Sequence, residues 1–139
     1  MNLVSDVMTA NPVCLDESAP VLDAAKAMRD KHIGNVIVTR SGRVFGILTD
    51  RDIVVRCLAQ DKDMRSCTCG EVCSSDDIVT VGRDATIDQA VKLMRDRSLR
   101  RLVVVDGDKP VGIVSLGDLA KEKDRASALG EISAAAPNL

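Results

Sequence analysis

Two aspartates occupy matching places in a motif that the chain contains twice. The first copy spans residues 46–52 (GILTDRD) and the second spans residues 112–118 (GIVSLGD). Each copy reads glycine, two aliphatic residues, a hydroxyl residue and, three positions later, an aspartate: Thr49 with Asp52, and Ser115 with Asp118. A carboxylate accepts two hydrogen bonds, as a ribose diol offers them. A hydroxyl beside free amides at a helix start suits a phosphate, so the motif indicates a ligand with both groups.

The same spacing also has a purely structural interpretation. Both copies fit a capping box, in which the hydroxyl and the carboxylate satisfy free backbone amides at the start of a helix. For a single copy this is the commoner explanation, because such caps are frequent. The two interpretations use the same geometry and are compatible. The choice between them depends on the rest of the chain.

Composition restricts the classes of protein and partner. The chain of 139 residues is one ordinary domain, or two small ones that share a core, and Phe45 is its only Phe, Tyr or Trp residue. The net charge is −2, so we expect no nucleic-acid partner and no membrane partner. Residues 1–12 lack a basic start followed by an apolar run, and no stretch approaches the length of a membrane span. We therefore expect a cytoplasmic protein.

The hydrophobic pattern predicts two units of the form β-α-β-β-α. In the first we expect a helical turn at residues 3–8, a strand at 13–15, a helix beginning near Pro20, strands at 35–39 and 44–48, and a helix at 50–58. Residues 60–66 are polar and read as a linker. In the second we expect a turn at 70–74, a strand at 78–81, a helix at 86–97, strands at 101–105 and 110–115, and a helix at 116–124.

This internal repeat is the strongest signal in the sequence. Residues 21–28 align with residues 87–94 without a gap, at the same offset as the two aspartate motifs. Each sheet is too small to stand alone, so we expect an α/β fold of tandem repeats whose sheets pack face to face with pseudo-twofold symmetry. That symmetry places two equivalent clefts between the halves. We assign residues 1–66 to the first repeat with its linker, 67–124 to the second, and 125–139 to a flexible tail.

These features resemble the cystathionine-beta-synthase (CBS) domain pair, or Bateman module, over about residues 3–124. The resemblance rests on the paired motifs, on residues 6–9 (DVMT) and 11–13 (NPV), and on residues 101–106 (RLVVVD) before the second motif. In length and in residues 48–53 (LTDRDI) the chain is similar to the small stand-alone bacterial members. The resemblance implies a homodimer of two modules, joined through exposed helix faces into a flat disc.

The family also implies a function. It is a regulatory module without catalysis that binds AMP, ADP or ATP, less often S-adenosylmethionine or NAD, and acts through a regulated protein that the sequence does not identify. No cofactor is required. Carried over residue by residue, Asp52 and Asp118 would take ribose hydroxyls, Thr49 and Ser115 would lie near the phosphate, and the adenine would be held by Ile47, Ile113, Val13 and Val79. Arg100 and Arg101 match positions where nucleotide-sensing relatives place basic residues against phosphates.

The resemblance further implies how the two clefts are composed. The cleft of Asp118 would combine Arg100 and Arg101 with Ile33 and Gly34, and the cleft of Asp52 would combine Gly34, Asn35, Leu99 and Val79. The sequence departs from the family in the first half: Cys14 replaces a threonine that the second half keeps as Thr80, and neutral residues 34–35 stand where the second half has arginines. We therefore expect the Asp118 cleft to bind phosphate more tightly.

The cysteines leave a second function open. Cys57, Cys67, Cys69 and Cys73 could hold zinc, but their irregular spacing differs from the paired Cys-x₂₋₄-Cys units of structural sites, so we predict no metal. An odd total of five cysteines with no export signal argues against a disulfide framework. Because the group lies in or beside the linker, exposed thiols that respond to oxidants are plausible. The alternative function is thus a protein-interaction or thiol-responsive module with vestigial nucleotide clefts.

The sequence offers no catalytic constellation. His32 is the single histidine and falls where a helix should end. No nucleophile motif accompanies it, and neither a phosphate-binding G-x-x-x-x-G-K-[ST] loop nor a dinucleotide-binding G-x-G-x-x-G motif is present. We therefore predict that the protein is not an enzyme.

Overall fold

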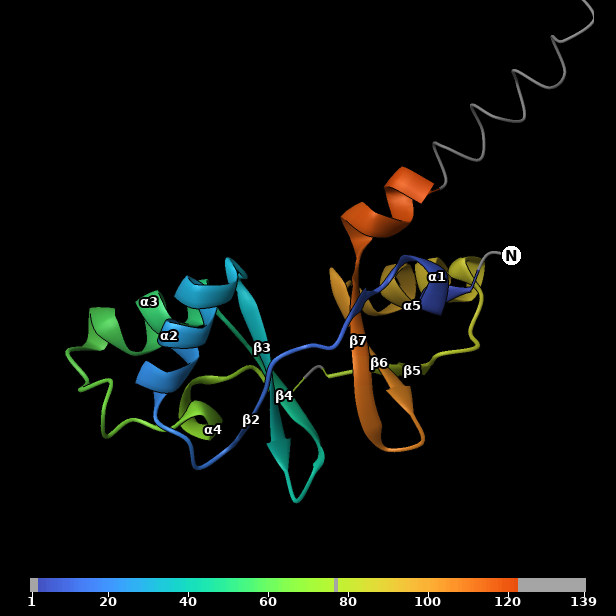
Figure 1. Ribbon diagram of the computed structural model, residues 1–139. Coiled ribbons are helices and arrows are strands. Elements are labelled where there is room, and N and C mark those ends of the chain that lie inside the picture. Colours follow the sequence, from blue (N-terminus) through green and yellow to red (C-terminus); the bar gives the residue numbers. More distant parts are fainter. Residues whose placement is uncertain (1–2, 77, 123–139) are drawn as a thin grey trace, which may run out of the picture.

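The chain forms two lobes, each a small sheet with helices on its outer face (Figure 1). The computed structural model describes residues 3–76 and 78–122. In chain order the elements are α1 (Val4–Val7), β1 (Thr9–Ala10), β2 (Cys14–Asp16), α2 (Val21–Lys31), β3 (Asn35–Arg40), β4 (Arg43–Thr49), α3 (Asp50–Arg56), the 3₁₀ helix η1 (Leu58–Gln60), α4 (Cys69–Val72), β5 (Thr80–Gly82), α5 (Ile87–Arg97), β6 (Arg101–Asp106) and β7 (Lys109–Ser115). Residues 116–122 are also helical.

The two sheets repeat the same topology. One has the order β2-β3-β4 and the other the order β1-β7-β6-β5. In each, an antiparallel hairpin (β3–β4 or β6–β7) is joined by a parallel strand, β2 or β5. Both hairpins shift register near the same place, after Val38 and after Val104. The agreement confirms the predicted α/β architecture of two repeats.

The opening segments of the two repeats exchange lobes. Strand β1 pairs with β7, and the side chain of Val4 is fully buried in the core of the second lobe. In the same way, α4 packs into the core of the first lobe, and Ser74 forms an isolated β-bridge with Ile47. Figure 1 shows α1 beside α5, and α4 on the same side of the first sheet as α2 and α3. Each lobe therefore contains a short segment from the other repeat.

A third apolar cluster joins the lobes. Its buried members lie near the middle of the hairpin strands, two from each sheet: Ile37, Ile47, Val103 and Ile113. Their strand neighbours Val36, Val38, Leu102 and Val104 point to the opposite face and pack against helices, as the alternation of side chains along a strand requires. The two sheets thus bury apolar faces against each other, as the sequence predicts.

Several element boundaries differ from the expected ones. The helix predicted at residues 50–58 ends at Arg56 and continues as η1, which stops at Asp61 in the left-handed conformation (φ 56°). The strand predicted from residue 78 starts at Thr80. Helix α4 begins one residue earlier than the predicted turn, because Thr68 accepts a hydrogen bond from the Glu71 amide (3.3 Å) and caps it. The predicted end of the last helix at residue 124 and the tail from residue 125 lie outside the described residues.

Two smaller expectations concern His32 and the membrane. His32 is the C-cap residue of α2 and adopts the left-handed conformation (φ 54°), so it ends that helix as predicted. Among residues 3–76 and 78–122, every helix is too short or too polar to span a bilayer.

Candidate functional site

Both aspartate motifs connect a strand to a helix and form complete capping boxes. Thr49 Oγ1 accepts a hydrogen bond from the Asp52 amide (3.1 Å), and Asp52 Oδ2 accepts one from the Thr49 amide (3.0 Å). Ser115 and Asp118 make the same pair of bonds, both at 3.1 Å. The structural interpretation of the motif is therefore confirmed. It engages one carboxylate oxygen, and within the described part of the chain Oδ1 of each aspartate has no hydrogen-bond donor, so it can accept one from a ligand.

A cleft of about 310 Å³ opens beside Asp52. Its apolar wall combines Ile47 with residues of the other repeat: Ile78, Val79 and Leu99. Its polar groups are the carboxylates Asp52 and Asp76, the hydroxyls Thr49, Ser74 and Ser75, and the arginines Arg56, Arg100 and Arg101. An apolar slot with a few convergent polar groups is the usual form of a small-molecule site.

A second cleft, of about 480 Å³, opens beside Asp118. Its apolar residues are Ala10, Pro12, Val13, Ile33 and Ile113, and its polar residues are Thr9, Asn11, Asn35 and Ser115. Gly34 completes the wall, and the cations are Lys31 and Arg101. This cleft is larger than that of Asp52 and has fewer basic groups, so the two sites are related by the repeat but differ in the number of cations that line them.

The composition of the clefts corrects part of the sequence interpretation. Asn35 was expected at Asp52 but lines the cleft of Asp118, and Arg100 was expected at Asp118 but lines that of Asp52. Gly34 was expected at both clefts and is among the lining residues of the Asp118 cleft only. The lobes pack crosswise, which means that the aspartate motif of each repeat faces the junction between helix and strand of the other repeat. Asp52 shares a cleft with the junction of α5 and β6, and Asp118 shares one with the junction of α2 and β3. The arginines at Asp52 therefore remove the reason for expecting tighter phosphate binding at Asp118, and the order of the two affinities stays a prediction. The placements of Leu99 and Val79 at Asp52, and of Ile33 and Arg101 at Asp118, agree with the expectation.

Two basic residues and one threonine also differ from the expected set. The sequence interpretation missed Arg56, whose Nη1 donates to the carbonyl oxygens of Val72 (3.4 Å) and Cys73 (3.2 Å) at the edge of the cleft. Its position four residues after Asp52 on one helix places both on the same face and could have identified it. It also missed Lys31 at the end of α2. Thr80 is exposed on β5 and is not among the residues that line the Asp52 cleft.

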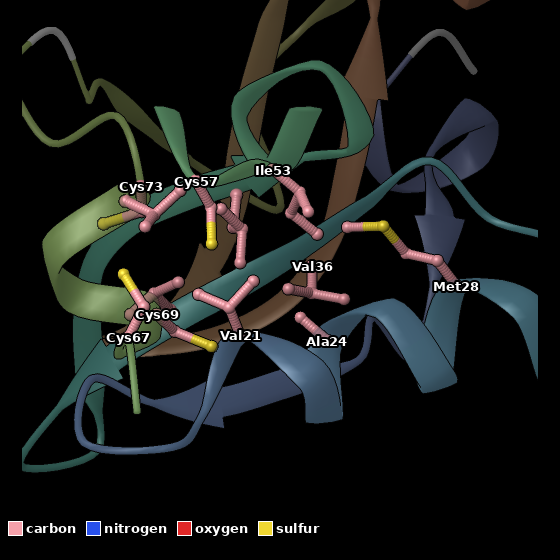
Figure 2. Packing of buried hydrophobic residues seen from close by; sticks show 12 residues of the cluster. Val21, Ala24, Met28, Val36, Ile53, Cys57, Cys67, Cys69 and Cys73 are labelled. Atoms are coloured by element: carbon pink, nitrogen blue, oxygen red, sulfur yellow. The ribbon is translucent and has the colours of Figure 1, made fainter. Parts of the chain in front are cut away.

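The four clustered cysteines belong to the core of the first lobe, not to an exposed linker. The side chains of Cys57, Cys67, Cys69 and Cys73 are buried and form no disulfide with one another, and Figure 2 shows them among Val21, Val36 and Ile53. Burial raises the pKa of the thiols of Cys67 and Cys69 to about 11, with nearby carboxylates (Glu71 and Asp23) adding to the effect. The alternative with exposed thiols in the linker does not hold for these four, because α4 and its flanking residues carry Cys67, Cys69 and Cys73 into the first lobe, where Cys57 lies at the end of α3. Cys14 is the exposed cysteine among the five.

Comparisons with known proteins agree with the geometry. The family model of the CBS domain matches residues 4–58 and 69–125. The chain is 35% identical over 137 residues to the CBS domain-containing protein YhcV of Bacillus subtilis, with 96% of each chain covered. It is 34% identical to the crystal structure of Hypoxic Response Protein I with two coordinated zinc ions (TM-score 0.73, covering 88% of this chain and 99% of that one). It is 25% identical to the CBS domain pair of protein MJ0100 in complex with 5-methylthioadenosine and S-adenosylmethionine (TM-score 0.75, covering 91% and 98%).

Proposed function

The chain belongs to the CBS domain family, and from this premise we propose that it is a cytoplasmic regulatory module that binds an adenine nucleotide and acts on a partner protein without catalysis of its own. The proposed ligand is AMP, ADP or ATP. The observation that carries the proposal is the composition of the Asp52 cleft. It brings a carboxylate with a spare acceptor oxygen, an apolar slot and arginines from both repeats around one volume of about 310 Å³.

Each part of the cleft matches one part of a nucleotide. The ribose diol can donate to Asp52 Oδ1, because the capping box occupies only Oδ2. The adenine fits between Ile47 and the apolar residues Ile78 and Val79, since a purine needs an apolar slot with a few polar partners. Forked guanidinium groups bind phosphate through paired hydrogen bonds.

The charges favour a phosphorylated ligand over a sulfonium. The related CBS pair of MJ0100 holds 5-methylthioadenosine and S-adenosylmethionine, so an adenosine moiety suits this architecture. In the present chain, three arginines and two carboxylates line the Asp52 cleft and leave an excess of positive charge, which favours an anionic phosphate over the positively charged sulfonium of S-adenosylmethionine. We therefore rank nucleotides above S-adenosylmethionine as the ligand.

The proposal includes a homodimer. Helix α3 and its continuation expose large aliphatic side chains on one side of the first lobe: Val54 (52% exposed), Val55 (44%) and Leu58 (60%). Leu116, at the start of the equivalent helix of the second lobe, is 46% exposed. Apolar groups gathered in this way mark interaction surfaces, and two modules that pair through them would form the disc implied by the family.

The thiol-responsive alternative has less support. A thiol reacts with oxidants as the thiolate, and a pKa of about 11 leaves little thiolate at neutral pH on Cys67 or Cys69. Zinc is bound by a relative, Hypoxic Response Protein I, but the present chain's absence of a resident metal stays a prediction.

A melting screen tests the proposed function. A ligand that binds only the folded state raises stability by mass action, by about 2.7 kcal/mol at one hundred times its dissociation constant. We expect AMP, ADP or ATP to raise the melting temperature more than NAD or S-adenosylmethionine does. The rise should shrink in Asp52→Ala measured against its own ligand-free baseline. If none of these ligands shifts the melting temperature at millimolar concentration, the proposal is wrong and an interaction module with empty clefts is favoured.

A further inference from the structure

Arg101 faces both clefts. It is the one described residue that lines the Asp52 cleft and the Asp118 cleft alike. It is the first residue of β6, paired in register with Ser115 at the end of β7, and its side chain is exposed between the lobes. Among residues 3–76 and 78–122 its guanidinium has no carboxylate or carbonyl partner, so it can bind a ligand without breaking a bond in the protein.

The basic side chain of Arg101 has no counterpart in the first repeat. The residue equivalent to Arg101 in the first half is Asn35, which pairs with Thr49 as Arg101 pairs with Ser115. Asn35 is short and neutral, and of the two clefts it lines only that of Asp118. A module with two clefts related by pseudo-twofold symmetry therefore has one central basic side chain between them, where symmetry would place two.

The other charged groups differ between the clefts. Arg56 and Arg100 face the Asp52 cleft together with the carboxylates of Asp52 and Asp76. Lys31 faces the Asp118 cleft together with Asp118. Arg101 is therefore the only guanidinium among the described lining residues of the Asp118 cleft, whereas it is one of a group at Asp52. A paired contact to phosphate uses two of the five guanidinium N–H donors along one edge, so a phosphate held in one cleft orients the side chain of Arg101 toward that cleft.

We propose that Arg101 is a shared phosphate ligand for which the two clefts compete, so that two phosphorylated ligands bind to one module anticooperatively. This inference rests on the proposed function and adds a regulation to it. A first nucleotide takes the guanidinium, and a second nucleotide in the other cleft binds without it. One module then responds to nucleotide over two separate concentration ranges.

Variants that leave one cleft intact test the sharing directly. Asp118→Ala retains the Asp52 cleft and Asp52→Ala retains the Asp118 cleft, with Asp→Asn as the substitute wherever Ala impairs folding by removing the cap. In both backgrounds we expect Arg101→Asn to weaken AMP binding about ten- to a hundredfold in titration calorimetry. The substitution introduces the residue type of the equivalent Asn35. The affinity for adenosine, which lacks the phosphate, should change less than threefold. Arg100→Ala is the matched control and should weaken AMP in the Asp118→Ala background alone.

The wild-type protein tests the competition. In the wild type, the second AMP should bind at least about tenfold more weakly than AMP binds to the same cleft in the variant that retains only that cleft. Arg101→Asn should reduce this difference in affinity. The inference is overturned if Arg101→Asn weakens AMP in one background only, or if the wild type fills both clefts with single-cleft affinities. In either case the proposed function stands. If AMP binds to none of these proteins, the proposed function and the inference both fail.

Discussion

A Cβ atom at Gly46 would lie 2.7 Å from the carbonyl oxygen of Ser74. The two backbone segments approach this closely because Ile47 and Ser74 exchange backbone hydrogen bonds of 3.0 and 2.9 Å. The second motif has the same relationship, since a Cβ atom at Gly112 would overlap Met8 and lie 3.1 Å from the carbonyl oxygen of Thr9. The glycine of each motif therefore accommodates the opening segment of the other repeat, and the hydroxyl and aspartate shape the cleft.

The first prediction concerns this contact. Gly46→Ala should lower the free energy of unfolding by about 1–3 kcal/mol, because the added methyl group meets a backbone carbonyl that cannot move away cheaply. Gly82→Ala is the matched control, since a Cβ atom there would meet nothing within 4 Å. Urea unfolding of both variants measures the difference. Equal stability of the two variants would contradict the steric explanation.

The second prediction reverses the expected order of the two clefts. Arg56, Arg100 and Arg101 line the Asp52 cleft, against Lys31 and Arg101 at Asp118, so the Asp52 cleft should bind AMP roughly tenfold or more tightly. In calorimetry, Asp52→Ala should remove the tight phase and Asp118→Ala should spare it. A tight phase that survives Asp52→Ala and disappears in Asp118→Ala would return the assignment to the one made from sequence.

The third prediction concerns thiol reactivity. In the native protein an aromatic disulfide reagent at pH 7.5 should modify Cys14 more rapidly than the four buried cysteines, because Cys14 is exposed, although desolvation also raises the pKa of its thiol. The time course of released thiolate gives the rates, and in Cys14→Ser the rapid phase should disappear. Rapid modification of Cys67, Cys69 or Cys73 would restore the thiol-responsive alternative.

The fourth prediction follows from the raised pKa values of Cys67 and Cys69, which change from 9.0 to about 11 chiefly through burial. The folded protein holds these protons more tightly than the unfolded chain does. The resulting stability is complete below pH 9 and is lost as the pH rises from 9 toward 11. By pH 10.5 the loss should be on the order of 1–2 kcal/mol.

Urea unfolding between pH 7 and pH 10.5 measures this dependence. Other groups also titrate in this range, so the comparison is with a Cys67→Ala/Cys69→Ala variant. That variant should be less stable at pH 7, because its core has lost volume, but its stability should fall less steeply above pH 9. The same slope in both proteins would show that these thiols are not the cause.

The fifth prediction tests the dimer surface. Val54 in α3 and Leu58 in η1 are more than half exposed, so Val54→Lys/Leu58→Lys should convert the expected dimer into a monomer. Light scattering at micromolar concentration measures the mass. Asp84→Lys, in an exposed turn of the second lobe, is the control and should leave the mass unchanged. A wild-type protein that is already monomeric at this concentration would sink the proposal of a homodimer.

The sequence by itself determined the features that depend on near neighbours in the chain. Apolar spacing located α2 and α5, alternation located the hairpin strands, and the Thr49–Asp52 and Ser115–Asp118 spacings predicted capping boxes that the structure contains. The duplication of these patterns was sufficient to predict two packed halves. All of these patterns involve residues a few positions apart, whose geometry is set by the local backbone.

Only the tertiary structure decided how distant segments meet. The exchange of α1 and α4 between lobes carries Val4 into one core and the three thiols of Cys67, Cys69 and Cys73 into the other, and no local pattern encodes it. The crosswise packing likewise assigns Arg100 to Asp52 and Asn35 to Asp118, and it places Arg101 between them. A repeat shows which residues are equivalent. Which equivalent copy lines a given cleft depends on the relative orientation of the two sheets, and that orientation is fixed by the apolar contacts that Ile37, Ile47, Val103 and Ile113 make across the interface between the lobes.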